Sequence, residues 1–210
     1  MPAELLAGMH GPGAARASPG RAALLCLAAS LLAGGAPGEE ERMSAELQIR
    51  SPRFEDGGTI PVDHTCEGRD VSPALGWSGV PEGARSLVLV VDDPDAPDPR
   101  KPRMTWVHWV LYDLPADSTG LAEAVAPADL PEGARQGRND WKRTGWGGPC
   151  PPIGRHRYFF KLFALDRPLG DLHEPDAKSL ERAMQGHVLA RAQLVGTYEK
   201  GRRAPAQGGS

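Results

Sequence analysis

The chain has 210 residues, of which 40% are hydrophobic and 24% are charged, a balance typical of a globular protein and unlike that of a fibrous or disordered one. Its length suits one domain with terminal extensions, and its 26 glycines and 21 prolines favour short elements joined by tight turns over a helical bundle. The formal net charge is -3 and basic residues form only small clusters, such as those at 142–143 and 202–203, so nucleic acid is not expected as a partner.

The first 36 residues have the order of a secretory signal peptide. Arg16 and Arg21 precede an apolar run at 22–33, and small residues follow at 34–36. The run, which contains Cys26, is shorter than the about 20 apolar residues of a transmembrane helix. We therefore predict a signal peptide or leader at 1–36 and a periplasmic or secreted protein. The alternative is a cytoplasmic protein with a mis-assigned start and a disordered leader.

A single domain is predicted from residue 45 to residue 200, because this part has no linker, low-complexity break or internal repeat. A solvated, disordered tail is expected at 201–210. Apolar and β-branched segments bounded by turn residues predict strands at 47–49, 86–91, 106–112, 157–165 and 194–198. In the segment 157–165, alternate residues are expected on one face of the strand, namely Tyr158, Phe160, Leu162 and Ala164.

One helix is predicted at 176–192, with Asp176 as its N-cap. Apolar residues recur there at helical spacing, at Leu180, Ala183, Met184, Val188 and Ala192. Because the strands are not separated by alternating helices, the predicted fold class is mainly β. We expect an antiparallel two-sheet β-sandwich with one or two peripheral helices.

Three segments carry residue types that suggest chemistry. The acidic, proline-rich loop 92–99 directly follows a buried strand, and His108 lies among tryptophans on an apolar strand. A Gly/Pro-rich loop at 147–154 leads through His156 into the next strand, and such a loop can expose backbone N–H groups beside an imidazole. Each segment alone also has a structural explanation, as an Asp-Pro turn, a core histidine or a loop that caps a sheet edge.

In this order the segments resemble the phosphatidylethanolamine-binding protein family, which includes Raf kinase inhibitor protein and plant flowering regulators. The family motifs match Asp-Pro-Asp-Ala-Pro at 93–97, Trp-x-His at 106–108, and Gly-Pro followed by Gly-x-His-Arg-Tyr within 148–158. Similarity to the bacterial and archaeal, Raf kinase inhibitor-like branch extends to further segments at 66–68, 71–73, 137–140, 147–152 and 186–190. The resemblance covers roughly residues 46–199.

The resemblance implies a small pocket at one end of the sandwich. By position it assigns eight ligand-binding residues, Asp93, Asp95, Trp106, His108, Gly148, Pro149, His156 and Tyr158. Imidazole, backbone N–H and phenol groups suit a phosphate monoester, and the carboxylates suit an ammonium or hold the histidine tautomers. We therefore expect a non-enzymatic protein that binds a small anionic or zwitterionic ligand, such as phosphate or a phosphorylethanolamine-like headgroup. Binding is expected to be tightest when the histidines are protonated. Modulation of a protein partner, as in the kinase-inhibitor members, stays open.

Cys66 and Cys150 are the two cysteines outside the leader. They form no zinc pattern, since neither belongs to a CxxC pair. An even pair in an oxidising compartment is compatible with a disulfide, but sequence alone does not bring the two together. Because both flank segments that the resemblance places at the pocket, we hypothesise that they are adjacent or bridged beside it.

The competing interpretation is a hydrolase of phosphoester or ester substrates that uses Asp93 or Asp95 with His108 and His156 as acid–base groups. The sequence has no Gly-x-Ser-x-Gly motif, and Cys150 is the one candidate nucleophile. The same side chains could ligate a metal, but we expect neither a metal nor a cofactor.

A homodimer is a further expectation, because two tryptophans of a Gly-rich loop, Trp141 and Trp146, could be exposed at an interface. The alternative is that they pack over the pocket.

Overall fold

The structure is a computed structural model that describes residues 46–201. The predicted leader at 1–36, with Cys26, and all but the first residue of the predicted tail at 201–210 lie outside the described residues. Within 46–201, no helix is both long enough and apolar enough to span a lipid bilayer.

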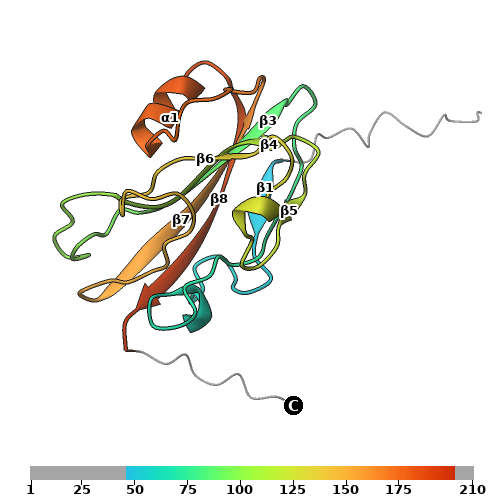
Figure 1. The fold of residues 1–210 in the computed structure, drawn as a ribbon. Coiled ribbons are helices and arrows are strands. Elements are labelled where there is room, and N and C mark those ends of the chain that lie inside the picture. The colour runs from blue at the N-terminus through green and yellow to red at the C-terminus, as the bar shows by residue number, and fades with distance from the viewer. Residues whose placement is uncertain (1–45, 202–210) are drawn as a thin grey trace, which may run out of the picture. The chain divides into compact units, whose positions relative to one another are not determined.

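Two antiparallel sheets form the fold, which confirms the predicted β-sandwich (Figure 1). The larger sheet has the strand order β6-β4-β3-β7-β8, and the smaller sheet has the order β1-β2-β5. The strands are β1 (Gln48–Arg50), β2 (Leu75–Ser78), β3 (Ser86–Asp93), β4 (Trp106–Pro115), β5 (Gly120–Leu121), β6 (Arg135–Gln136), β7 (Arg155–Leu165) and β8 (Val188–Glu199). The helix α1 covers Ala177–Met184, and short 3-10 turns lie at Val62–His64 and Pro127–Asp129.

The main hydrophobic core lies between the two sheets and is built by strand alternation. On β7 the residues predicted to share a face are all buried in this core, namely Tyr158, Phe160, Leu162 and Ala164. Phe160 lies near its centre, with its ring centroid 5.5 Å from that of Phe54 and 6.0 Å from that of Trp146. The smaller sheet contributes Ile49, Leu75 and Trp77 from the other side.

The helix α1 closes part of the opposite face of the larger sheet. Leu180 and Met184 of the helix pack on a second cluster that includes Val88, Val110 and Leu165. Asp176 caps the helix as predicted, since its side chain accepts a hydrogen bond from the Ser179 N–H. With its two faces covered in this way, β3 is buried along all eight residues.

The predicted extent of the helix to residue 192 is wrong. The helix ends at Met184, and the chain turns at Gly186, which has a φ of +79° that a residue with a side chain rarely adopts. Val188 and Ala192 belong to β8, paired with Leu165 and Leu162 of β7. The helical spacing of apolar residues continues by chance beyond Met184, and Gly186 was the one sign in the sequence that the helix ends there.

Several strand limits also differ from the prediction. β4 does not stop at residue 112 but continues to Pro115, because Asp113, with a φ of +54°, is absorbed in a β-bulge opposite β3. The Asp113 carboxylate accepts hydrogen bonds from the N–H groups of Leu169 and Gly170, which holds the bulge in place. β8 begins six residues before the predicted 194, and the two- to four-residue strands β2, β5 and β6 were not predicted.

We predict that Phe160→Ala lowers the free energy of unfolding by about 3–5 kcal/mol, because it leaves a cavity among rings that cannot collapse onto it. Urea denaturation at pH 7 measures this change. The matched control is Leu189→Ala on β8, a side chain that is 47% exposed and should change stability by less than about 0.5 kcal/mol. Equal effects of the two substitutions would contradict this placement of the core.

Candidate functional site

A cavity of about 390 Å³ lies at one end of the larger sheet. The end of β3 and the starts of β4 and β7 meet there because neighbouring strands are antiparallel; Asp93 pairs with Trp106, and Asp92 with Phe159. The cavity is lined by Asp93, Ala96, Pro97, Met104, Trp106, His108, Trp141, Cys150, Pro151, Pro152, His156 and Tyr158. Five of the eight residues predicted for the pocket are in this lining, and Asp95, Gly148 and Pro149 are not.

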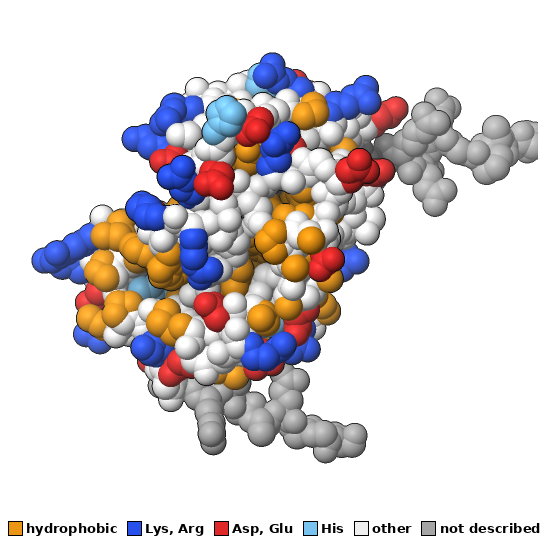
Figure 2. Space-filling model, in the orientation of Figure 1, with side chains coloured by type: hydrophobic (Ala, Val, Ile, Leu, Met, Phe, Trp, Pro, Cys, Tyr) orange, Lys and Arg blue, Asp and Glu red, His pale blue; other side chains and the backbone are white. Residues whose placement is uncertain are grey.

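Figure 2 shows, towards the left, a group of hydrophobic side chains with a histidine visible among them. Most of the lining is apolar or aromatic, and a few polar groups are placed among these surfaces. This composition is usual for sites that bind small molecules.

The carboxylate of Asp93 connects the end of β3 to the start of β7. Its Oδ2 lies 2.7 Å from Nδ1 of His156, and its Oδ1 accepts a 2.8 Å hydrogen bond from the backbone N–H of Asp95. Nε2 of His156 donates to the carbonyl oxygen of Ile153 at 3.0 Å, since a carbonyl can only accept. Burial raises the pKa of Asp93, and the hydrogen bond with His156 opposes that shift. Both ring nitrogens of His156 are therefore engaged by the protein.

Asp95 is turned towards Arg157 instead of the cavity. Its two carboxylate oxygens accept three hydrogen bonds of 2.7–2.9 Å from the guanidinium and the backbone N–H of Arg157. These hydrogen bonds hold the pKa of Asp95 below its usual range. Asp95 thus fastens the 92–99 loop to β7 and places Asp93, to which its own N–H donates.

His108 is buried on β4 with one nitrogen satisfied. Its Nδ1 lies 2.6 Å from the carbonyl oxygen of Gly147, so Nδ1 carries the proton and the neutral ring keeps a lone pair on Nε2. Burial lowers the pKa of His108 to about 4, so the ring is neutral at pH 7. Within residues 46–201, Nε2 is buried and has no hydrogen-bond partner.

Residues 46–201 have five buried side-chain atoms without a partner, and two of them belong to residues that line the cavity. The one besides His108 Nε2 is Nε1 of Trp106, which is a donor. We call His108 Nε2 and Trp106 Nε1 the open atoms. Trp141 packs edge-on against the rings of Trp106 and His108, at centroid distances of 5.4 and 5.2 Å, and is itself 40% exposed. The Tyr158 ring lies 5.1 Å from His108, and burial raises the pKa of its phenol, which therefore stays protonated. The cavity thus brings together an acceptor, a donor and a phenol.

The turn at Gly148 and Pro149, predicted to cradle an anion, instead holds the 62–70 segment. The Gly148 N–H donates to Oδ1 of Asp70 at 2.7 Å, and the Pro149 carbonyl accepts from the N–H of Cys66 at 3.1 Å. A Cβ atom at residue 148 would overlap the carbonyl oxygen of His64, so this close approach requires glycine. The backbone N–H expected for the anion is therefore already engaged.

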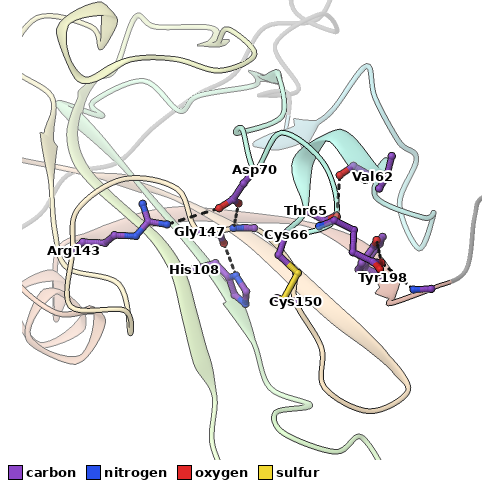
Figure 3. The surroundings of a disulfide bond; sticks show 12 residues. Val62, Thr65, Cys66, Asp70, His108, Arg143, Gly147, Cys150 and Tyr198 are labelled. Carbon is purple, nitrogen blue, oxygen red and sulfur yellow. Dashed lines mark hydrogen bonds and ion pairs between the residues drawn. A yellow bond between two sulfur atoms is a disulfide. The ribbon is translucent and has the colours of Figure 1, made fainter.

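Cys66 and Cys150 form a disulfide bond in the structure, with Cα atoms 5.4 Å apart (Figure 3). Cys150 also lines the cavity, so the bridge lies beside it, as hypothesised. Trp146 is buried in the main core, where its Nε1 donates to the carbonyl oxygen of His64. It is therefore not an exposed interface residue, whereas Trp141 packs over the cavity.

Residue types alone did not single out three contributors to the site. Asp70 and Arg157 act through hydrogen bonds to other site residues, and the Gly147 carbonyl is a backbone group that every sequence has. Among residues 46–201, no three His, Cys, Asp or Glu side chains are grouped as metal ligands would be.

Comparison with known proteins matches residues 50–199 to the family model described as phosphatidylethanolamine-binding protein. The UPF0098 protein of Methanothermobacter thermautotrophicus is 49% identical over 158 residues, which cover 74% of this chain and 100% of that protein. The UPF0098 protein of Aquifex aeolicus is 44% identical, with coverage of 74% and 90%.

Two solved structures are also similar. The putative phosphatidylethanolamine-binding protein homolog CT736 from Chlamydia trachomatis has a TM-score of 0.68 and 41% identity, over 74% of this chain and 98% of that one. YbcL from E. coli, described as a new member of the mammalian family, has a TM-score of 0.67 and 35% identity, over 74% and 99%.

We predict that His108 makes the protein less stable as the pH falls from 8 to 4.5. The folded-state pKa of about 4 lies below the ordinary value of 6.5, so between these values the unfolded chain binds a proton that the folded chain does not. The loss reaches roughly 2–3 kcal/mol at pH 4.5. Urea denaturation at pH 8, 6 and 4.5 measures it.

His108→Gln should remove this component of the pH dependence, while the control His173→Gln, at an exposed surface histidine, should keep it. An NMR titration in which the His108 ring protonates near pH 6.5 would show that the prediction is wrong.

Proposed function

The chain belongs to the phosphatidylethanolamine-binding protein family, and we propose that it binds a small phosphate monoester in the cavity between the ends of β3, β4 and β7, without turning it over. The observation that carries this proposal is the pair of open atoms. A buried polar group without a partner costs about 1–3 kcal/mol, so a ligand that supplies both missing partners gains affinity by relieving that cost.

A singly protonated phosphate monoester has the groups that the open atoms lack. Its P–OH can donate to Nε2 of His108, and its charged oxygens can accept from the Trp106 Nε1–H and the Tyr158 hydroxyl. Hydrogen bonds to charged oxygens are stronger than neutral ones, which suits an anion in an otherwise apolar cavity. The organic part of the ligand would then lie against Pro97, Met104 and Trp141.

The proton on the ligand takes the place of the protonated histidines expected from the sequence. His108 is neutral at pH 7, and both nitrogens of His156 are used within the protein. The complex contains one proton between the phosphate oxygen and Nε2. This proton is either already on the ester or taken up from solution on binding, and the pH dependence is the same in both cases. Binding should therefore tighten as the pH falls towards the second pKa of the ester, about 6.

Binding without turnover is supported by the state of Cys150, the candidate nucleophile. Cys150 is bonded to Cys66, so its sulfur carries no thiolate in this state. The Asp93–His156 pair, which could act as acid and base, is hydrogen-bonded to backbone groups at both ends. These hydrogen bonds to the backbone hold Asp93 and His156 in fixed positions, which suits side chains that form the wall of a binding site.

Access to the open atoms is proposed to involve Trp141. Its indole packs on the rings that carry them, comes from a loop, and is more exposed than its partners. A ligand that slides under or displaces this ring would reach both atoms. A change in tryptophan fluorescence on binding is therefore expected.

We predict that phenyl phosphate binds roughly 50–100-fold more tightly at pH 5.5 than at pH 8, following the fraction of singly protonated ester. Isothermal titration calorimetry measures this ratio. Glycerophosphorylethanolamine, a diester without a P–OH, should bind more weakly than phosphorylethanolamine at pH 5.5. An affinity that does not change with pH would contradict the shared proton.

Trp106→Phe keeps the ring but removes the donor, and should weaken binding of phenyl phosphate about tenfold or more. The control Leu189→Ala lies on β8 outside the cavity lining and should bind as the wild type does. Equal affinity of the Trp106 variant and the wild type would refute the site. Release of inorganic phosphate during the titration would revive the hydrolase interpretation.

A further inference from the structure

We propose that the Cys66–Cys150 disulfide is a thiol-exchange site, and that its reduction by a dithiol loosens the 144–154 loop, changes the proton position on His108 and weakens ligand binding. The part about ligand affinity rests on the proposed function. The part about the loop and His108 does not.

The disulfide is accessible to a reductant. Both cysteines are exposed, in contrast to Trp146, Gly147, Gly148 and Pro149, which lie just before Cys150 and are buried. Exchange requires a thiolate to approach a disulfide sulfur, so exposure favours it, and exposed bridges are the ones that are most readily reduced. At the same time Cys150 lines the cavity, so the bond that would break is part of the cavity wall.

Contacts beside the bridge connect the loop to the rest of the fold. The 62–70 segment and the loop are joined by the Cys66 N–H to the Pro149 carbonyl, the Gly148 N–H to Asp70, and Trp146 Nε1 to the His64 carbonyl. Arg143 adds an ion pair with Asp70 at 3.9 Å (Figure 3). Because the core packing of Trp146 remains, we expect reduction to leave the sandwich folded. The hydrogen bonds of Gly148 and Pro149 to the 62–70 segment join the two segments that the bridge ties together, and we expect these contacts to weaken when the bridge is broken.

The same loop sets the tautomer of His108. Gly147 lies three residues before Cys150, its carbonyl accepts the Nδ1–H of His108 at 2.6 Å, and its N–H donates to the His108 carbonyl at 3.1 Å. Figure 3 shows the His108 ring and Gly147 close to the bridge. When the loop is looser, the Gly147 carbonyl holds the proton on Nδ1 less firmly. The Nε2–H tautomer then becomes populated. Its Nε2–H donates to a phosphate oxygen and leaves the P–OH without an acceptor, so it favours the doubly charged ester, which is the minor form at pH 5.5.

The exchange balances without any further reactant. The dithiol loses two hydrogens and becomes a disulfide, the Cys66–Cys150 bond breaks, and each cysteine sulfur gains one hydrogen. The thiolate of the dithiol attacks one sulfur to form a mixed disulfide, which its second thiol then resolves. The reverse reaction with an oxidised dithiol restores the bridge.

The test compares the full chain before and after treatment with dithiothreitol, in four measurements: free thiols, circular dichroism, the ¹⁵N NMR spectrum of the His108 ring, and calorimetric binding of phenyl phosphate at pH 5.5. On reduction we expect two more free thiols, an unchanged β-sheet spectrum, a His108 signal shifted towards the Nε2–H tautomer, and affinity reduced about fivefold or more.

The double variant Cys66→Ser/Cys150→Ser is the matched control and should resemble the reduced protein with and without dithiothreitol. Two new thiols with no change in the His108 signal or in affinity would overturn the proposal. Loss of the β-sheet spectrum on reduction would also overturn the proposal, because the disulfide would then be required for the fold itself. If the oxidised protein fails to bind phenyl phosphate, the proposed function is wrong, and the His108 signal still decides between the tautomers.

Discussion

The hydrogen bond between Asp93 and His156 is the contact on which the site depends, because it connects the last residue of β3 to the second residue of β7 where their ladder ends. Buried carboxylates are costly unless they are hydrogen-bonded, and here each oxygen of Asp93 has a partner. The Asp95–Arg157 hydrogen bonds add a second connection, from the loop two residues after Asp93 to the residue that follows His156 on β7. A loop of twelve residues between β3 and β4 is thus fixed at its base, and one wall of the cavity with it.

Two histidines only 48 positions apart receive opposite roles from their surroundings. His156 has both nitrogens satisfied and completes the wall, while His108 has one nitrogen bound to a backbone carbonyl and the other left open. The difference follows from what each ring faces: a carboxylate and a carbonyl for His156, and one carbonyl and aromatic rings for His108. An apolar environment keeps His108 neutral and so makes it an acceptor at neutral pH.

The sandwich and its long strands could be predicted because apolar and β-branched residue patterns indicate strands. The residues at the strand ends could be predicted because the motifs occur in the order typical of the family. The family resemblance assigned Asp93, Trp106 and His108 to one pocket, and in the structure antiparallel pairing brings these three positions together at one end of the larger sheet. The sequence could not assign partners. Gly148 and Asp95 have the residue types of ligand-binding groups, yet their polar groups are used by Asp70 and Arg157, which come from other segments. Backbone acceptors such as the Gly147 carbonyl leave no signal in a sequence at all.

The cavity divides its tasks between rigid and adjustable parts of the chain. The open atoms are at the start of β4, where Trp106 and Val107 pair with Asp93 and Asp92 of β3, so their positions are set by the sheet. Trp141 and Cys150 come from the long connection between β6 and β7, which is joined to the rest of the fold by the disulfide, by hydrogen bonds and by the buried ring of Trp146. The groups on the strand therefore have fixed positions that do not depend on the disulfide. The 2.6 Å contact between the Gly147 carbonyl and His108 Nδ1 links the loop to the strand, and it is the contact through which we propose that a change at the loop reaches the open atom of His108.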